Sequence, residues 1–416
     1  MEMNKKPFAK IDELVSCFDG LYDKNSTEYQ LSRYQDALNS FRNIYGYDSF
    51  YVASSSGRVE LCGNHTDHNG GKVLCTAISL DSLAFFMPTD DGVITVNSEG
   101  YDEFKVDTKL IENSFVANSR SLVKGVCDGL TKRGYKIGGF NVYITSNVLG
   151  GAGISSSASF ELLTTEILNF LYNDGKVSCE EKALISQYAE NVFYFKPCGL
   201  LDQASISYGG VNLLNFSNKE KLQVKSCDKD INDFKLVLIN TGGSHDNLTE
   251  EYASIPREMK SVANFFGKDR LVEVNETDFY NRANEISSKC GDRAFLRAKH
   301  FFDENKRVEE AFIYLQKGDF NGLCDALNSS GKSSLEYLQN CYVSGETNQP
   351  IVKALSLLSS LEETGAVRVH GGGFAGCVLC LVKANIFDKF LSRVYNWYDK
   401  SSVIPLAIRN KGAIVL

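Results

Sequence analysis

A turn rich in glycine and serine, residues 147–159, joins a predicted strand at 139–144 to a predicted helix at 156–172. The apolar residues of that helix recur with helical spacing. Glycine lets the backbone approach a ligand closely, and the free N–H groups and dipole of a helix start favour an anion. The turn therefore predicts a phosphate site where a sheet meets a helix. A capped helix that follows a flexible turn is the alternative explanation.

Two familiar phosphate loops do not fit this turn. A Walker A loop ends in Gly-Lys-Ser or Gly-Lys-Thr, and residues 147–159 contain no lysine. A dinucleotide-binding fingerprint needs a glycine where this chain has Ser156. A phosphate bound here would depend on backbone N–H groups rather than on a lysine of the loop.

The chain is expected to fold as two lobes. Its 416 residues suit two domains, and short runs rich in Val, Ile, Phe and Tyr between 49 and 96 predict strands of a mixed sheet. We predict helices at 11–18, 28–45, 121–133 and 180–192. A polar stretch at 219–233 precedes a further strand at 235–239. We therefore predict an α+β protein with domains 1–225 and 226–416 and a ligand site between the lobes.

Charge and composition exclude some classes of partner. The formal net charge is −8 and the pI is about 5.4, so we expect no nucleic-acid or anionic-membrane partner. The N-terminal stretch lacks the apolar core of a signal peptide, and no apolar run approaches the ~20 residues that span a bilayer. We expect a cytoplasmic protein that acts as a monomer.

The twelve cysteines are spread along the chain, and a cytosol would keep them reduced. One Cys-x-x-Cys occurs, at Cys377 and Cys380, in an apolar strand-like run without a second pair to complete a zinc site. Residues three apart on a strand face opposite sides, so the two sulfurs should not converge. We predict a structural role for both.

Three further segments are candidates for function. Residues 57–71 lead from a strand into a loop of short polar side chains, which suits either a polyol or a solvated hairpin turn. Glu190 closes a helix and Asp202 follows a loop stiffened by Pro197, so this pair could serve a metal and a reacting hydroxyl, or be surface acids. Residues 367–377 place three consecutive glycines between strands, for a close backbone approach or a tight turn.

Taken in order, these segments resemble the GHMP family of small-molecule kinases, and within it the galactokinases. Residues 57–71 look like the family signature Gly-Arg-Val-Asn-Leu-Ile-Gly-Glu-His-Thr-Asp-Tyr-Asn-Gly-Gly. Residues 150–159 are similar to Gly-Gly-Gly-Leu-Ser-Ser-Ser-Ala-Ser, and 197–203 to Pro-Cys-Gly-Ile-Met-Asp-Gln. Residues 371–377 match the C-terminal glycine-rich motif. The four motifs extend from residue 57 to 377, so the resemblance covers nearly the whole chain.

The resemblance implies a fold and an activity. The fold would pair an N-terminal lobe, a mixed sheet with helices like ribosomal protein S5, with a C-terminal lobe of ferredoxin-like α/β layers. The activity would be ATP-dependent phosphorylation of D-galactose at the anomeric C1 hydroxyl, giving α-D-galactose 1-phosphate. ATP would be the co-substrate and Mg²⁺ the metal, and a small sugar and ATP would be the binding partners.

The family pattern also implies residue roles. Asp202 would be the catalytic base, with Arg58 beside it. The sugar would contact Asn64, His65, Asp67, Gly199 and Tyr252. The nucleotide phosphates would lie along Gly150, Gly151, Ala152, Gly153, Ile154, Ser155, Ser156 and Ser157. Mg²⁺ would be held by Ser157 and Glu190.

Three departures from the family pattern bear on specificity. Asn64 replaces a glutamate that contacts the sugar near C6, and Glu60 and His68 replace an asparagine and a tyrosine of the same loop. Ser119 stands where many relatives carry a tryptophan that stacks on adenine. A related sugar 1-kinase acting on N-acetylgalactosamine, L-arabinose or galacturonate therefore stays open, as does a sugar sensor without catalysis on the same scaffold.

Overall fold

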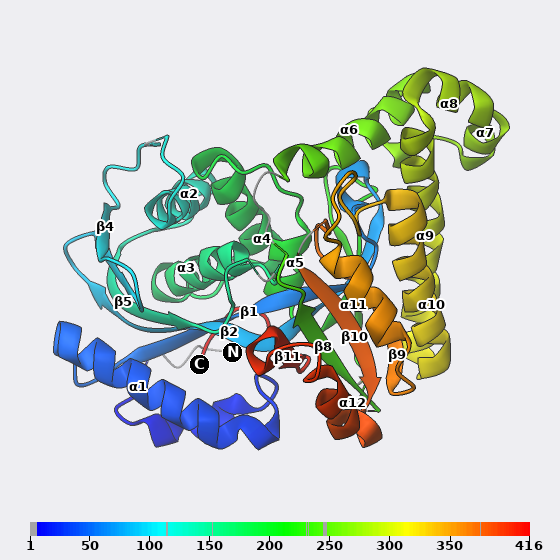
Figure 1. Cartoon of the computed structure of the whole chain (residues 1–416). Coiled ribbons are helices and arrows are strands. Elements are labelled where there is room, and N and C mark those ends of the chain that lie inside the picture. Colours follow the sequence, from blue (N-terminus) through cyan, green and yellow to red (C-terminus); the bar gives the residue numbers. More distant parts are fainter. Residues whose placement is uncertain are drawn as a thin grey trace.

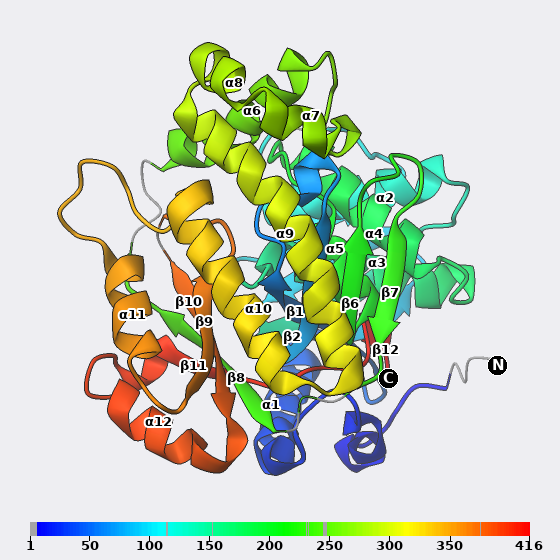
Figure 2. The ribbon, with the colours of Figure 1, turned by 90° about the vertical axis from the view of Figure 1, so that its right-hand side faces the viewer.

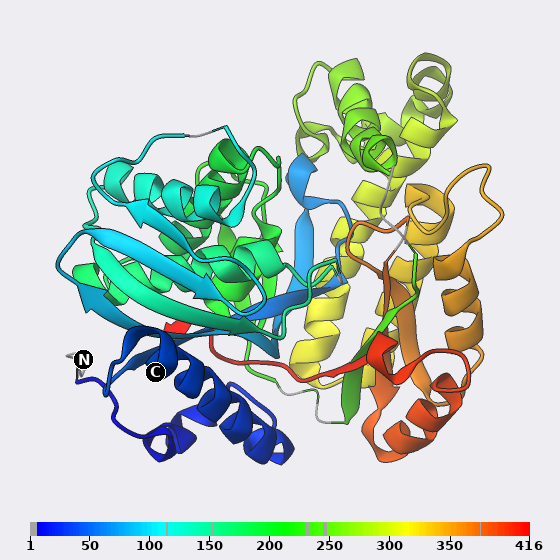
Figure 3. The ribbon, with the colours of Figure 1, turned by 60° about the vertical axis from the view of Figure 1, so that its left-hand side comes forward.

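The computed structural model describes residues 6–113, 115–151, 153–229, 231, 233–243, 248–374 and 376–416. Its helices and strands form two lobes that lie side by side, each built on its own sheet (Figure 1). The end of the first long strand rises between the lobes (Figure 3). The predicted α+β, two-lobed architecture is confirmed.

In the described residues the first sheet has eight strands. They are β1 (Tyr51–Cys62), β2 (Lys72–Thr89), β3 (Val93–Ser98), β4 (Phe104–Asp107), β5 (Gly139–Ser146), β6 (Val211–Asn215), β7 (Gln223–Cys227) and β12 (Ile414–Val415). β1 and β2 are antiparallel along most of their length, and β2 pairs first with β6 and then with β5. The pair β3–β5 is parallel.

The sequence predicted separate short strands at 49–53 and 58–62, and again at 72–77 and 82–87. This was wrong, because β1 and β2 each continue through both runs. The polar residues Ser54, Ser55 and Ser56 look like a loop in the sequence, yet they are fully buried within β1. Ser54 donates to the carboxylate of Asp81 on β2, and Arg409 donates to Ser54 Oγ at 2.7 Å. Partners distant in sequence therefore satisfy the Ser54 hydroxyl inside the sheet.

Helices cover both faces of this sheet (Figure 1). On one face lie the 3₁₀ helix η1 (Ile11–Phe18) and α1 (Thr27–Tyr45), whose apolar residues pack against Val52 and Phe85. On the other face α2 (Ser119–Lys132) and α3 (Ser156–Asn173) pack against Ala53 and Phe86. Neighbouring strand residues thus point into different cores. The remaining helices of this lobe are α4 (Cys179–Tyr188), the π-helical turn η4 (Ala189–Phe193) and α5 (Leu201–Tyr208).

The second sheet is antiparallel, in the order β11 (Val403–Leu406), β8 (Phe234–Asn240), β10 (Cys377–Lys383) and β9 (Thr364–His370). α9 (Asp292–Lys317) and α10 (Phe320–Ser333) cover one face, and α11 (Pro350–Ser359) and α12 (Phe387–Val394) cover the other. Cys377 packs in the first of these cores and Cys380 in the second. The prediction that the two sulfurs diverge is confirmed.

A helical projection extends from the second lobe (Figure 2). It consists of α6 (Thr249–Phe265), α7 (Glu276–Asn281), α8 (Ala283–Cys290) and the adjoining end of α9, around a core that contains Met259, Phe279 and Phe301. Among the described residues no helix is both long and apolar enough to cross a membrane.

The chain returns to the first lobe at its C-terminal end. β12 pairs with β1, with Val415 opposite Ala53, and Arg409 forms a buried ion pair with Asp81 at 3.4 Å. β7 contains both residues on either side of the predicted boundary, 225 and 226, and belongs to the first sheet. The division into 1–225 and 226–416 stays a prediction, and residues 407–416 contact the first lobe.

Candidate active site

Asp202 lies in the first turn of α5 and forms an ion pair with Arg58 of β1. Both Nε and Nη2 of Arg58 face Asp202 Oδ1, at 2.8 and 2.7 Å. The arginine side chain is only 9% exposed and the aspartate 32% exposed, so the acid can still be reached from outside. The guanidinium also donates to the carbonyl of Gly153. One arginine therefore joins the predicted base to the predicted phosphate loop.

Ser155 brings the phosphate loop into direct contact with Asp202. Its hydroxyl donates to Asp202 Oδ2 at 2.5 Å. Ser155 precedes α3 and has left-handed backbone, with φ 67° and ψ 55°. That conformation is costly for a residue with a Cβ atom, and it places the hydroxyl on the side of Asp202 rather than in a helix cap.

The loop is also anchored to the second lobe. His370, at the end of β9, donates from Nε2 to the carbonyl of Gly153 at 3.2 Å, with the ring in its neutral form. Burial, with the charge of Arg58 adding to it, lowers the pKa of His370 to about 3. Gly57 of β1 lies so close to the loop that a Cβ atom there would be 2.8 Å from the carbonyl oxygen of Ile154. Both lobes therefore position residues 153–155.

Ser157 and Glu190 meet at the start of α3. The Ser157 hydroxyl donates to Glu190 Oε1 at 2.9 Å, and Glu190 is 1% exposed at the beginning of the π-helical turn η4. Gln203 donates to Glu190 Oε2 at 2.8 Å. Lys196 also reaches this carboxylate, with Nζ 2.7 Å from Oε1.

A second acid, Glu161, stands one helical turn beyond Ser157 on α3. It is fully buried, and Gln203 links it to Glu190 through a 3.3 Å bond to Glu161 Oε2. Burial, followed by the charge of Glu190, raises the pKa of Glu161 well above its ordinary value. Glu161 therefore stands behind Glu190 in surroundings that disfavour its ionised form.

The donor set at Ser157 and Glu190 fits a Mg²⁺ ion. Mg²⁺ prefers hard oxygen ligands, and in phosphoryl-transfer sites it usually takes only one or two from the protein. A hydroxyl and a carboxylate oxygen 2.9 Å apart at a helix N-terminus supply such a pair. In the described residues no group of three or more His, Cys, Asp or Glu side chains could form a larger metal cage.

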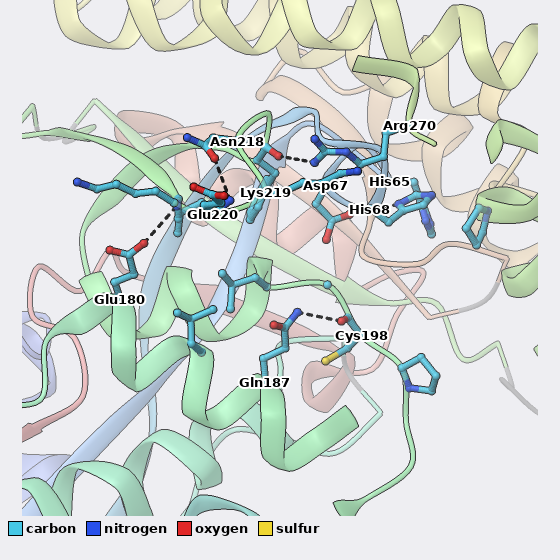
Figure 4. Close-up of a pocket in the computed structure, with 18 of the residues that line it drawn as sticks. His65, Asp67, His68, Glu180, Gln187, Cys198, Asn218, Lys219, Glu220 and Arg270 are labelled. Atoms are coloured by element: carbon cyan, nitrogen blue, oxygen red, sulfur yellow. Dashed lines mark hydrogen bonds and ion pairs between the residues drawn. The ribbon is translucent and has the colours of Figure 1, made fainter. Parts of the chain in front are cut away.

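A cavity of about 720 Å³ lies beside this region (Figure 4). Its lining includes four of the five predicted sugar contacts, which are His65, Asp67, Gly199 and Tyr252. Figure 4 shows His65, Asp67 and His68 grouped on one side, with Gln187 and Cys198 across from them. Asp202 and Arg58 are not among the lining residues, but Leu200 is. The segment 196–202 therefore connects the cavity to the phosphate loop.

The ionisation of His65 and Asp67 follows from their surroundings. Burial and the neighbouring His68 lower the pKa of His65 to about 4, so the ring is neutral at pH 7 and Nε2 donates to the carbonyl of Gly372 at 3.0 Å. Burial alone would raise the pKa of Asp67, but its bond to His68 and the two imidazoles outweigh burial and lower it. The Nδ1 atom of this neutral ring is then an acceptor, so the imidazole and the Asp67 carboxylate can both accept from hydroxyl groups.

Gly199 fits closely against Asp67. A Cβ atom at residue 199 would be 1.9 Å from Asp67 Oδ2. Only glycine allows the carboxylate to lie against this backbone. Tyr252 donates to the carbonyl of Gly373 at 2.8 Å, and a Cβ atom at Gly372 would collide with its ring at 2.5 Å. The glycine-rich motif at 371–377 therefore makes room for Tyr252.

Asn64 is in a different position from the other predicted sugar contacts. It is 1% exposed, donates to the carbonyl of Gly371 at 2.8 Å and accepts from Asn340 at 2.7 Å. It also donates to Glu60 Oε1 at 3.1 Å, and Glu60 pairs with the buried Arg368 at 3.0 Å. The acid and amide that are exchanged relative to the family signature therefore contact each other. A direct role of Asn64 toward the sugar stays a prediction.

Helix α9 of the second lobe supports residues 63–72, which we call the sugar loop, and the sequence did not predict this. Glu304 accepts from the backbone N–H of Gly63 at 2.9 Å, and His300 donates from Nε2 to the carbonyl of Asn64 at 2.9 Å. Asn305 accepts from the N–H of Lys72 at 2.7 Å. We call these three side chains the α9 brace. A lone histidine and two polar residues on a long helix carry no local signal for such a task.

Comparison of the sequence with known proteins identifies the family of this chain. A model described as the galactokinase galactose-binding signature matches residues 39–88, and one described as the GHMP kinases N terminal domain matches residues 121–210. A galactokinase of Clostridium tetani is 30% identical over 368 residues, covering 86% of this chain and 91% of the relative. The chain belongs to the galactokinase family. The resemblance inferred from the four motifs is confirmed.

Solved structures agree on the fold. The crystal structure of Lactococcus lactis galactokinase complexed with galactose matches with a TM-score of 0.80 at 23% identity, covering 92% of this chain and 100% of that one. A mevalonate kinase of Methanococcus jannaschii matches with a TM-score of 0.61 at 15% identity, over 86% of this chain and 98% of that one. The GHMP kinase fold predicted from the galactokinase motifs is confirmed.

The structure thus brings most of the predicted site together. Asp202, Arg58, Gly153 and Ser155 are in contact, as are Ser157 and Glu190, and the sugar-loop residues line the neighbouring cavity. Ala152 lies outside the described residues. Ser119, the first residue of α2, is exposed. The individual roles of these residues stay predictions, and Lys196 and the α9 brace are additions to them.

Proposed function

We propose that the chain transfers the γ-phosphoryl group of ATP to the C1 hydroxyl of D-galactose, giving α-D-galactose 1-phosphate and ADP. Membership of the galactokinase family supports the reaction, and the 2.5 Å contact between Ser155 and Asp202 is the observation that carries the assignment of the site. A phosphate seated at residues 150–157 and a sugar held beside Gly199 would both be within reach of Asp202.

In this proposal Asp202 accepts the proton of the C1 hydroxyl. The hydroxyl oxygen forms the new bond to the γ-phosphorus, and the bond from that phosphorus to the β,γ-bridging oxygen breaks, so ADP leaves. Both carboxylate oxygens already accept a bond, from Arg58 and from Ser155, but a carboxylate has about four lone-pair positions. Room therefore remains for a sugar hydroxyl.

Charge on the transferring group has to be balanced, because phosphoryl transfer passes through a loose transition state dominated by positioning and electrostatics. Backbone N–H groups of residues 150–157 and the N-terminus of α3 would face the phosphates. A Mg²⁺ ion bound by Ser157 and Glu190 would offset further negative charge there. Arg58 holds the loop and the base together.

The sugar would be oriented by the cavity side. Asp67 offers acceptor oxygens, His65 has a neutral ring fixed by the Gly372 carbonyl, and Gly199 lets Asp67 lie against the backbone. Asn64 would hold the glycine-rich motif in place through its bond to the Gly371 carbonyl. A change in the Asn64 side-chain conformation would let its amide contact the sugar near C6. We place the activity in the cytoplasm, because all twelve cysteines are in described positions and all are free thiols.

The test is an ADP-release assay on purified protein over a panel of free monosaccharides, with the phosphorylated position read by NMR. We expect galactose to give the highest kcat/KM and phosphate at C1. The variant Asp202→Asn should keep sugar binding in calorimetry and lose turnover by about 10²- to 10⁴-fold, the usual contribution of a general base.

Two results would contradict the proposal. ATP consumption without preference for a sugar of the galactose configuration would reject galactose as substrate. Equal turnover of wild type and Asp202→Asn would reject Asp202 as the base. Because discrimination is a ratio of specificity constants, the comparison uses kcat/KM rather than KM alone.

A further inference from the structure

Lys196 is a cation at the phosphate site that the proposed mechanism does not use. The phosphate loop itself contains no lysine, but Lys196 reaches the site from the segment before α5. Its ammonium lies 2.7 Å from Glu190 Oε1, the same oxygen that accepts the Ser157 hydroxyl at 2.9 Å. The side chain of Lys196 is 59% exposed, whereas the side chain of Glu190 is 2% exposed. The lysine therefore covers the carboxylate from the solvent side.

The backbone directs Lys196 to this place. Phe195 has left-handed backbone with φ 60°, and its ring stacks on Phe115 with centroids 5.7 Å apart and planes inclined by 17°. The N–H of Lys196 then donates to the carbonyl of Glu190 at 3.1 Å. The chain is thus turned back onto the π-helical turn η4. A residue held in this costly conformation indicates a segment whose geometry the surroundings determine.

The position of the ammonium conflicts with the metal site. The Ser157 and Glu190 oxygens are the pair that fits Mg²⁺, and a Mg²⁺ ligand lies about 2.0–2.1 Å from the ion. An ammonium 2.7 Å from the same carboxylate oxygen takes up the charge and the space that such an ion needs. Two cations that compete for one oxygen exclude each other, so binding of the metal requires Lys196 to move.

We propose that Lys196 is a built-in counter-ion of the phosphate site. Without nucleotide its ammonium holds the cation position at Glu190, and when ATP binds it moves onto the nucleotide's terminal phosphates and leaves that position free for the metal. The proposal rests on the function proposed above. An exposed ammonium on a flexible four-carbon stem can make such a move, and lysine binds phosphate as a mobile point charge. The lysine that the phosphate loop lacks is thus supplied by residue 196.

The first experiment measures binding of metal-free ATP by isothermal titration calorimetry in excess EDTA. We expect Lys196→Met to bind ATP at least tenfold more weakly than wild type, and Lys196→Arg to retain most of the affinity. Adenosine, which has no phosphates, should bind all three proteins equally. Lys332→Met is the matched control, since Lys332 is 71% exposed on α10 and pairs only loosely with Glu336, at 3.8 Å.

The second experiment measures binding of Mn²⁺ alone, without nucleotide, from the electron paramagnetic resonance signal of the free ion. Removal of the competing ammonium should raise the Mn²⁺ affinity of Lys196→Met several-fold over wild type, and Lys332→Met should match wild type. Circular dichroism and thermal melting establish that each variant is folded. Neither measurement depends on turnover.

Three outcomes would overturn the proposal. They are no measurable binding of metal-free ATP by wild type, equal ATP affinity of wild type and Lys196→Met, and equal Mn²⁺ affinity of the two. Either of the two equal affinities would mean that the ion pair between Lys196 and Glu190 has only a structural role. Galactose-dependent ADP release by the wild-type preparation is measured in parallel. If no such release is found, the proposed function is rejected, and the two binding measurements still test the role of Lys196.

Discussion

The two glycine-containing loops of the site differ in what surrounds their glycines. In the sugar loop, a Cβ atom at Gly63 would be 2.5 Å from the carbonyl oxygen of Lys72, and one at Gly71 would be 2.5 Å from the Thr66 side chain. In the phosphate loop, a Cβ atom at Gly150 or Gly151 would meet nothing within 4 Å. The first pair of glycines serves close packing, and the second pair leaves open space.

This difference indicates how far each binding site is formed before its ligand binds. The α9 brace bonds the backbone of the sugar loop at Gly63, Asn64 and Lys72, so the loop is shaped before any sugar arrives. The phosphate loop is bonded at its start, where Asn147 donates to the carbonyl of Asp81, and again at residues 153–155. Its glycines between these two points, Gly150 and Gly151, face open space. We infer a prebuilt sugar site next to a phosphate site that the ligand itself completes.

The largest predicted effect separates the two kinds of glycine. Gly63→Ala adds a Cβ atom against the backbone at a φ of +108°, which costs about 1–2 kcal/mol in conformation and a similar amount in overpacking. We expect the free energy of unfolding to fall by about 3 kcal/mol. Gly150→Ala should change it by less than about 1 kcal/mol, since the site is open. Urea denaturation of both variants checks this.

The kinetics of the Gly150→Ala control sharpen the comparison. If the open glycines serve nucleotide access, this variant should raise the KM for ATP and leave the KM for the sugar as in wild type. A stable Gly63→Ala protein, or a destabilised Gly150→Ala protein, would refute the distinction between packed and open glycines.

A second prediction concerns pH and the histidines that bind the two loops to the second lobe. Burial is the main cause that lowers the pKa of His370 to about 3 and of His65 to about 4, and it also lowers the pKa of His300. The unfolded chain has histidine pKa values near 6.5, so below that pH it binds protons that the folded chain does not. Stability is therefore complete above about pH 6.5 and falls as the pH drops toward the folded values.

For His370 and for His65 the expected size is about 1.4 kcal/mol per pH unit, or about 2 kcal/mol each at pH 5. Urea denaturation between pH 7 and pH 5 measures the slope. His370→Gln, whose amide can still donate to the Gly153 carbonyl, should remove one histidine's share of that slope. An unchanged slope in this variant would show that His370 titrates normally in the folded protein.

Local sequence signals predicted the helices best. α1 ends at Tyr45 because Gly46 takes up left-handed backbone with φ 73°, and the sequence shows that stop directly. The strands were predicted in pieces, because the serines at 54–56 look like a loop in the sequence. The partners of the buried Ser54 hydroxyl are Asp81 and Arg409, and Arg409 lies near the other end of the chain. A propensity argument has no access to such partners.

Dependence on partners distant in sequence also separates the site residues that were predicted from those that were missed. Residues inside the four motifs, such as Asp202 and Ser157, could be found because their order along the chain resembles a family. His300 and Lys196 act through contacts with Asn64 and Glu190, and nothing in their own neighbourhoods distinguishes them from surface or core residues. Only the folded arrangement shows which backbone groups and which carboxylate they reach.

The smallest predicted effect concerns Ser155, where the phosphate loop meets the base. Ser155→Gly relieves the left-handed conformation, worth about 1 kcal/mol, but loses a bond to the partly exposed Asp202 of similar size. We expect the free energy of unfolding to change by less than about 1 kcal/mol. Ser155→Ala loses the same bond and keeps the strain, so it should be the less stable of the two by about 1 kcal/mol.

Turnover then separates stability from positioning. Both Ser155 variants remove the hydroxyl from Asp202, so both should lower kcat by up to about tenfold, which corresponds to about 1.4 kcal/mol, with the KM for the sugar unchanged. Steady-state kinetics and urea denaturation of the two proteins measure this. Equal stability of Ser155→Gly and Ser155→Ala would mean that the left-handed backbone carries no strain. A kcat loss as large as that of Asp202→Asn would mean that Ser155 takes part in the proton transfer itself, because strain and one lost bond are too small to account for it.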